Sequence, residues 1–112
     1  MKKLFVNGKK FVDETGAHII LSGINFVCKE RSLNYITKCD DAVFEWFKDL
    51  GFNVIRMGLI WDGVEPSPLQ YDDDYLRKIK RFVGLAREND IYVFLDMHQD
   101  LYSYKYGDGA PE

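Results

Sequence analysis

Residues 91–100 read Ile-Tyr-Val-Phe-Leu-Asp-Met-His-Gln-Asp, an apolar run followed directly by acidic and other polar side chains. Short apolar runs rich in β-branched and aromatic residues are typical of strands that are buried on both faces of a sheet. In α/β barrels, functional residues lie just beyond the carboxyl ends of such strands. Residues 91–100 therefore predict a buried parallel strand with chemically useful side chains at its end.

The residues before this strand alternate between helical and strand patterns. Residues 72–89 begin with three aspartates, which favour a helix N-terminus, and continue with apolar side chains at helical spacing. A second apolar strand is predicted within residues 53–61. Before it, a helix is predicted from its N-cap Asp40 to Gly51, which closes it. Residues 18–27 predict the first strand, again buried on both faces.

A separate β-hairpin is predicted near the start of the chain. Asn7-Gly8 lies between two short apolar runs, which is the strongest short-range hairpin pattern. The order is then hairpin, strand, helix, strand, helix, strand, and this alternation predicts a parallel α/β sheet. The sequence has no GxGxxG after the first strand and no GxxxxGK[ST], so it supports neither a dinucleotide-binding fold nor a P-loop.

This order predicts the fold class: α/β, the N-terminal part of a (β/α)8 TIM barrel, with a β-hairpin, the first three parallel strands and two helices. A complete barrel needs about 250 residues. Residues 1–112 are therefore predicted to form an incomplete N-terminal segment of one barrel domain. The hairpin, residues 1–17, is predicted to cap the bottom of that barrel.

Composition excludes several classes of protein. With 15 Lys+Arg against 18 Asp+Glu and a net charge of −3, the chain is not expected to bind nucleic acid. The longest apolar run, Ile91–Leu95, is too short to span a membrane. The N-terminal residues lack the hydrophobic region of a signal peptide, so we expect a cytoplasmic location. Cys28 and Cys39 form no CxxC pair; reduced thiols are expected, and an internal disulfide stays open.

Polar side chains gather where the predicted strands end. Lys29 follows the first strand, and Arg56 lies within the second; Asp96, His98 and Asp100 follow the third. Because the carboxyl ends of barrel strands share one rim, we expect these side chains to line a common cleft. Carboxylates, an imidazole and cations suit sugar hydroxyls, which they bind through charge-assisted hydrogen bonds.

The segment Asp96–Asp100 and the isolated Arg56 each allow more than one interpretation. If the segment is extended, its first, third and fifth side chains share one side. They could bind sugar, form an acidic loop with a structural carboxylate–histidine pair, or ligate a metal. No complete set of metal ligands lies nearby in the sequence, so we predict no metal and no cofactor. Arg56 needs a carboxylate partner, either in a structural ion pair or as a cation that keeps a catalytic carboxylate ionised.

Several motifs resemble glycoside hydrolase family 5. The resemblance covers essentially the whole chain in order. Its last block, residues 96–111, is similar to the endoglycoceramidase-like branch and is the most specific part. The motifs that carry it are Phe11-Val12-Asp13, Gly16-Ala17-His18, Leu21-Ser22-Gly23-Ile24-Asn25, Gly51-Phe52-Asn53-Val54-Ile55-Arg56, Trp61, Glu65-Pro66, Tyr71, Asp96-Met97-His98-Gln99-Asp100, Ser103 and Gly107-Asp108-Gly109-Ala110-Pro111.

The resemblance implies a retaining β-glycosidase that hydrolyses the O-glycosidic bonds of a glycolipid or another β-glycoside. In that family one glutamate, the second residue of an Asn-Glu pair ending the fourth strand, is the acid/base, and a glutamate ending the seventh strand is the nucleophile. Glu65 follows Val64 after the second strand and is interpreted as shaping its loop. Glu112 comes too early in the chain. The resemblance thus implies no catalytic glutamate in this chain, which is predicted to be inactive alone.

The resemblance also assigns supporting functions to residues of this chain. Lys29, Asp96, His98 and Asp100 match positions that bind the substrate's sugar, and Arg56 matches a residue that supports the nucleophile. Asn25 is expected to be structural or to support the site.

Two other functions stay open. A three-strand part of a barrel leaves open sheet edges, so the chain could instead be a non-catalytic sugar-binding module that self-associates through those edges. A stand-alone α/β protein with a different ligand would keep the same strand order. It would not explain why Lys29, Arg56, His98 and Asp100 all follow or lie within strands.

Overall fold

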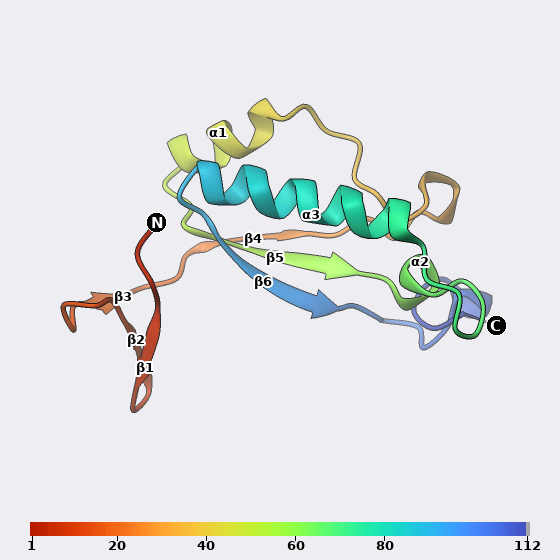
Figure 1. Cartoon of the computed structure of the whole chain (residues 1–112), viewed down its shortest axis with the longest axis horizontal. Coiled ribbons are helices and arrows are strands. Elements are labelled where there is room, and N and C mark those ends of the chain that lie inside the picture. Colours follow the sequence, from red (N-terminus) through yellow and green to blue (C-terminus); the bar gives the residue numbers. More distant parts are fainter. Residues whose placement is uncertain (112) are drawn as a thin grey trace.

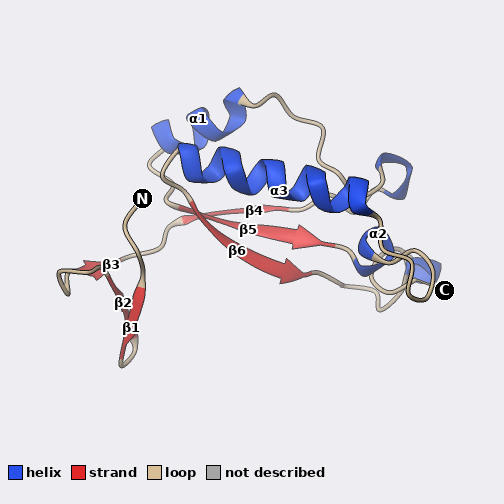
Figure 2. Cartoon of the chain, in the orientation of Figure 1, coloured by secondary structure: helices blue, strands red, loops and turns tan. Residues whose placement is uncertain are grey.

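The computed structural model describes residues 1–111, which form two sheets and a layer of helices (Figure 1). Helices α1 and α3 lie on one side of the larger sheet, and the small sheet is set apart beyond the start of β4 (Figure 2). Glu112 lies outside the described residues. In chain order the elements are β1 (Phe5–Asn7), β2 (Lys10–Val12), β3 (His18–Ile19), β4 (Gly23–Phe26), η1 (Arg31–Leu33), α1 (Ala42–Asp49), β5 (Val54–Leu59), α2 (Trp61–Val64), α3 (Asp73–Glu88), β6 (Tyr92–Met97) and η2 (Tyr104–Tyr106).

The larger sheet is parallel and has the strand order β4-β5-β6. β4 pairs with β5 from Gly23↔Val54 onward, and β5 pairs with β6 from Val54↔Tyr92 onward. Helix α1 connects the first two strands, and α2 and α3 connect the next two. These crossovers confirm the predicted fold class, the N-terminal part of a (β/α)8 barrel.

Helices α1 and α3 begin and end close to the predicted positions. The Asp72 carboxylate caps α3 by accepting a hydrogen bond at 2.9 Å from a backbone N–H of the first turn, which is the main reason why the pKa of Asp72 is lowered. Gly51 follows α1 with φ of +82°, the left-handed conformation that favours glycine. The N-cap of α1 is Asp41, one residue after the predicted Asp40. The Asp40 side chain instead accepts a hydrogen bond from the N–H of Ala42 at 3.1 Å.

The hydrophobic core lies between the parallel sheet and helices α1 and α3. Phe26 of β4 packs edge-on against Phe82 of α3, with ring centroids 5.3 Å apart, and lies 5.6 Å from the ring of Phe44 in α1. Ile55 and Met57 of β5 point into the same cluster and are 0% and 1% exposed. Because burial of this apolar surface drives folding, the cluster fixes both helices on one face of the sheet.

Within residues 1–111, helices cover only one face of the parallel sheet, so the prediction of strands buried on both faces is wrong. Strand alternation and register place Asn25, Arg56 and Phe94 on the opposite face, which we call the open face. Phe94 is 61% exposed there. The apolar runs predict surfaces that would be packed if the barrel were closed. Three strands do not close a barrel, so one of these surfaces stays open.

A cavity of about 700 Å³ lies between the open face and the small sheet. Leu4 and Phe11 from the small-sheet side line it together with Val54, Arg56 and Phe94 from the open face. Its walls are mostly apolar, which is the character of the interior of a barrel rather than of a polar surface.

Residues 18–27 form two strands rather than the predicted single strand. β3 pairs with β2 in the small antiparallel sheet, whereas β4 joins the parallel sheet. At the break between them, Asn53 Nδ2 donates to the carbonyl of Ile20, and Asn53 Oδ1 accepts from the N–H of Ser22, both at 2.8 Å. This side chain satisfies backbone groups that would otherwise pair within a sheet. The predicted hairpin itself is confirmed, since β1 and β2 pair antiparallel around Asn7-Gly8.

Three further observations complete the fold. Residues 61–64 form the short helix α2, so Trp61 begins a helix rather than ending the predicted second strand. Cys28 and Cys39 are both free thiols. None of the described helices combines the length and the apolar character needed to cross a lipid bilayer.

Candidate functional site

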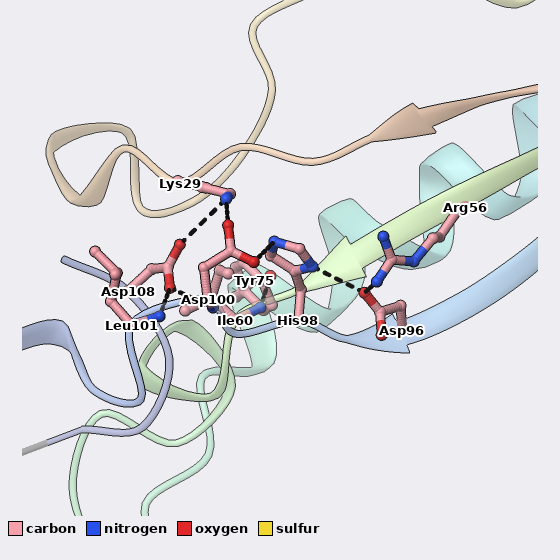
Figure 3. A network of polar contacts seen from close by, with 9 residues as sticks. All are labelled: Lys29, Arg56, Ile60, Tyr75, Asp96, His98, Asp100, Leu101 and Asp108. Atoms are coloured by element: carbon pink, nitrogen blue, oxygen red, sulfur yellow. Dashed lines mark hydrogen bonds and ion pairs between the residues drawn. The ribbon is translucent and has the colours of Figure 1, made fainter.

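The predicted polar residues lie in one line across the carboxyl ends of the parallel strands. Figure 3 shows this line, which runs from Lys29 through Asp100, His98 and Asp96 to Arg56. Lys29 follows β4, Arg56 lies on β5, and the other three residues lie on β6 or directly after it. We call these five residues the rim cluster. The structure thus brings together the four residues predicted to bind substrate and Arg56, the residue predicted to support the nucleophile.

Asp96 joins the two halves of the rim cluster. Its Oδ2 lies 2.8 Å from Nη2 of Arg56 and 2.9 Å from Nδ1 of His98. The extended backbone of β6 places Asp96 and His98 on the same side, as alternation predicts. Asp100 continues the line, with Oδ1 3.6 Å from Nε2 of His98, and forms an ion pair with Lys29.

The imidazole of His98 lies between two carboxylates, with Nδ1 2.9 Å from Asp96 and Nε2 3.6 Å from Asp100. A carboxylate can only accept hydrogen bonds, so Nδ1 of the imidazole donates to Asp96. The His98 side chain is 10% exposed, and its buried Nε2 has no hydrogen-bond partner among the described residues. A buried nitrogen without a partner is costly. The Asp100 carboxylate faces this nitrogen at 3.6 Å, too far for a hydrogen bond.

Arg56 has the carboxylate partner that its place in an apolar strand demands, namely Asp96. The guanidinium is not buried, however, because the Arg56 side chain lies on the open face and retains 40% of its exposure. Because the strand around Arg56 is apolar and is predicted to be buried on both faces, this exposure is a correction to that prediction. Asn25 lies beside Arg56 in the strand register and also lines the cavity on the open face.

The metal interpretation also has a partial geometric basis. Ligand atoms of His98, Asp100 and Asp108 lie within 4.8 Å of one another. However, the ammonium of Lys29 pairs with Asp100 and lies 3.7 Å from an oxygen of Asp108. Lys29 already supplies the positive charge that a metal ion would bring to these carboxylates. We therefore interpret the group as an ion-paired cluster.

An aromatic side chain lies beside the rim cluster. Trp61, His98 and Gln99 line a small pocket of about 160 Å³. Trp61 Nε1 donates to Glu65 at 3.0 Å, and the other oxygen of Glu65 accepts from the N–H of Leu69 at 2.7 Å. These two contacts, the backbone one first, lower the pKa of Glu65. They agree with the interpretation of Glu65 as a loop-shaping residue.

The sequence analysis overlooked a buried contact that joins three loops around the site. Asp62 of α2 accepts a hydrogen bond from the hydroxyl of Tyr35 at 2.6 Å and forms an ion pair with Arg31 at 3.1 Å. Arg31 also stacks over the ring of Tyr104, 3.6 Å from its centroid. Burial, followed by the Asp62 contact, raises the pKa of Tyr35. No local pattern marks these residues, since they come from three separate parts of the chain.

A second overlooked residue is Asp108, whose side chain is 3% exposed. It lies between Gly107 and Gly109 in a motif that the sequence analysis quoted without assigning it a function. An acidic residue flanked by two glycines is a recognisable turn pattern. That pattern indicates a turn but not the contacts of the carboxylate.

A parallel α/β segment with charged groups at the carboxyl ends of its strands defines the class of (β/α)8-barrel enzymes. The family described as Cellulase (glycosyl hydrolase family 5) matches residues 12–112. The chain belongs to glycosyl hydrolase family 5.

Similar sequences point to one branch of this family. The chain is 32% identical over 104 residues to an endoglycoceramidase of Cyanea nozakii, with 88% of the chain and 21% of that protein covered. It is 31% identical over 113 residues to endoglycoceramidase I of Rhodococcus hoagii, with 97% of the chain and 23% of that protein covered. The chain thus spans about a fifth of the length of these relatives.

Solved structures agree with the sequence comparison. The fold superposes on an endogalactoceramidase with a TM-score of 0.82 and 29% identity, covering 100% of this chain and 30% of that one. It superposes on endo-glycoceramidase II from Rhodococcus sp. with a TM-score of 0.76 and 34% identity, covering 89% of this chain and 24% of that one. Another structure of the Rhodococcus enzyme is a complex with ganglioside GM3.

Proposed function

We propose that this chain is the sugar-binding N-terminal portion of an endoglycoceramidase-like retaining β-glycosidase, which hydrolyses the O-glycosidic bond of a glycolipid or another β-glycoside. The observation that carries the proposal is the line of charged groups at the strand ends, in which Nε2 of His98 faces Asp100 without a hydrogen bond. The names of the similar proteins support the glycolipid as substrate class.

In this proposal each member of the rim cluster has a defined task. His98 Nε2, Asp100 and Lys29 bind sugar hydroxyls, because charged groups form the strongest hydrogen bonds to such ligands. Asp96 fixes the orientation of the imidazole and offers its own oxygens to the sugar. Arg56 fixes Asp96 and lies on the open face, where it would support a nucleophile carried by a later strand.

The chemistry of bond cleavage would come from residues beyond this chain. Retaining glycosidases use two carboxyl groups about 5–5.5 Å apart, one as acid/base and one as nucleophile. In the proposed enzyme both glutamates belong to later strands, and the small sheet caps the bottom of the barrel. The rim cluster would then hold the sugar while these two groups act on its anomeric carbon.

The chain alone is expected to show no hydrolysis of a fluorogenic β-lactoside. The reason is that it holds sugar-binding groups but not the proposed carboxyl pair. The measurement is fluorophore release over hours at high protein concentration, compared with buffer. Turnover that survives purification and disappears in His98→Ala would contradict the expectation, because catalysis would then reside in these residues.

Sugar binding by the chain is expected to depend on His98. In a titration with methyl β-lactoside followed by NMR, His98→Ala should weaken binding about tenfold or more, since a hydrogen bond to a charge-assisted group is lost. The matched control is His18→Ala, because His18 lies in β3 of the small sheet, away from the rim cluster. Equal affinities of the wild type and His98→Ala would count against the proposed sugar site.

A second candidate function, self-association of a partial barrel, is favoured by the outer strand β6. Within the described residues β6 pairs on one side only, with β5, and its Phe94, Leu95 and Met97 are exposed. An unpaired edge with apolar side chains is a template for pairing with another chain. Two copies could therefore join through β6.

If β6 joins two copies, the molar mass in solution should rise with protein concentration, and Leu95→Lys should reduce that rise. The lysine places a charge on the edge, which opposes edge-to-edge pairing. Sedimentation equilibrium measures both proteins, and Ile20→Lys serves as a control at an exposed position outside the strands. A wild-type chain that stays monomeric at every concentration and unfolds cooperatively would rule this candidate out.

A further inference from the structure

We propose that Asp108 is a positioning residue that holds the Lys29–Asp100 pair in the geometry in which it binds a sugar, an inference that rests on the proposed function of that pair. Asp108 does not itself offer a surface to a ligand, since its side chain is 3% exposed. Lys29 and Asp100 are about half exposed and can reach a ligand. Asp108 would therefore act through these two residues.

One oxygen of Asp108 fixes the backbone of the acidic partner. Its Oδ1 accepts the N–H of Asp100 at 2.9 Å and the N–H of Leu101 at 3.3 Å (Figure 3). A carboxylate that accepts two successive backbone N–H groups fixes the direction of the chain at that point. The direction in which the Asp100 side chain leaves the backbone is thereby set.

The other oxygen of Asp108 faces the basic partner. Its Oδ2 lies 3.7 Å from Nζ of Lys29, which at the same time pairs with Asp100. Lys29 follows β4 and Asp100 follows β6, and these strands are separated in the sheet by β5. One buried carboxylate therefore links the two outer strands of the sheet across the end of the middle one.

The turn that carries Asp108 is fixed independently of the pair. Gly109 has φ of +119°, and a Cβ there would lie 2.6 Å from the carbonyl oxygen of Tyr102. The N–H of Asp62 donates to the carbonyl of Gly109 at 2.9 Å, which ties the turn to α2. Because the turn is anchored to α2, the Asp108 carboxylate has a fixed position. It can therefore restrict the otherwise flexible side chain of Lys29.

Two variants separate the contacts of Asp108. Asp108→Asn keeps an oxygen for the two backbone N–H groups but removes the negative charge that faces Lys29. Asp108→Ala removes both. Amide hydrogen exchange followed by NMR reports the backbone contacts at Asp100 and Leu101. Acylation by acetic anhydride, measured by mass spectrometry relative to Lys9 and Lys10 of the hairpin, reports the freedom of the Lys29 ammonium.

The expected results differ between the two variants. In Asp108→Ala the amides of Asp100 and Leu101 should exchange about tenfold faster, whereas in Asp108→Asn they should stay near the wild-type rate. Acylation of Lys29 should rise about two- to fivefold in both variants. Asp74→Asn, at an exposed aspartate of α3, is the control and should change neither readout.

Methyl β-lactoside titration of the same samples completes the test. Asp108→Asn should bind the glycoside more weakly than the wild type, although its backbone contacts persist. If Asp108→Asn matches the wild type in lysine acylation and in affinity, Asp108 is only a turn residue and the inference is overturned. If both variants change as expected but the wild type binds no lactoside, the positioning contacts are supported and the proposed sugar site fails instead.

Discussion

Replacing Gly23 by alanine is expected to prevent β4 from pairing with β5 and to unfold the parallel sheet. A Cβ at position 23 would lie 1.6 Å from the carbonyl oxygen and 2.7 Å from the carbonyl carbon of Val54 in the paired strand. Backbone atoms of a central strand cannot move away without breaking the ladder, so this overlap has no local remedy. The total stability of a domain is only about 5–15 kcal/mol, and the loss of one outer strand can exceed it.

The measurement is urea unfolding followed by circular dichroism. Gly23→Ala should show no cooperative transition, or a midpoint close to zero denaturant. Gly84→Ala is the matched control, because a Cβ at position 84 meets nothing within 4 Å and alanine favours the α3 helix by up to about 1 kcal/mol. A Gly23→Ala chain that unfolds at the wild-type midpoint would show that β4 and β5 do not approach as closely as described.

Truncating Phe44 to alanine is expected to reduce the free energy of unfolding by about 3–5 kcal/mol. Phe44 is fully buried and contacts the rings of Phe26, Phe47 and Phe82, with centroids between 5.6 and 6.0 Å away. Its removal would leave a cavity where α1, α3 and β4 meet. Those rings cannot all shift to fill the space, because each also packs on another element.

Trp46→Ala on the same helix is the control for Phe44→Ala. Trp46 is 57% exposed, and its ring lies 5.7 Å from that of Phe47. Its truncation should change the free energy of unfolding by about 1 kcal/mol or less. Equal losses for the two variants in thermal and urea unfolding would mean that α1 is not anchored by the aromatic cluster.

Elements with local determinants could be predicted from the sequence. The α3 helix, predicted within residues 72–89 and observed at Asp73–Glu88, begins at a capping aspartate and carries a regular apolar face. The hairpin depends on Asn7-Gly8, and both features lie within a few residues of the structure that they cause. The parallel order of the strands followed from the alternation of strand and helix.

Features with distant determinants could not be predicted. The break between β3 and β4 depends on the side chain of Asn53, which is more than thirty residues away from Ile20 and Ser22. The open face could not be inferred either. Apolar residues in a strand indicate a surface suited to burial, but they do not show whether another element covers that surface.

In the candidate site, too, local relations could be predicted from the sequence and distant contacts could not. Alternation along β6 predicted that Asp96, His98 and Asp100 share one side, because the relation among them is local. The contacts of Asp108 with Lys29 and of Asp62 with Tyr35 join loops that the sequence separates widely. Only the folded chain brings those partners together, so no spacing rule would have found them.

The alternation of the strands has a consequence for how this segment can evolve. Core residues Ile55 and Val93 carry odd numbers, whereas Arg56, Asp96 and the other residues that follow β6 in the rim cluster carry even ones. A single inserted or deleted residue within β6 would exchange the faces of the β6 residues beyond it and turn their charges toward the core. Point substitutions at the even positions of β6 can therefore change the charged set while the core is kept, whereas single-residue length changes in this strand are expected to be selected against.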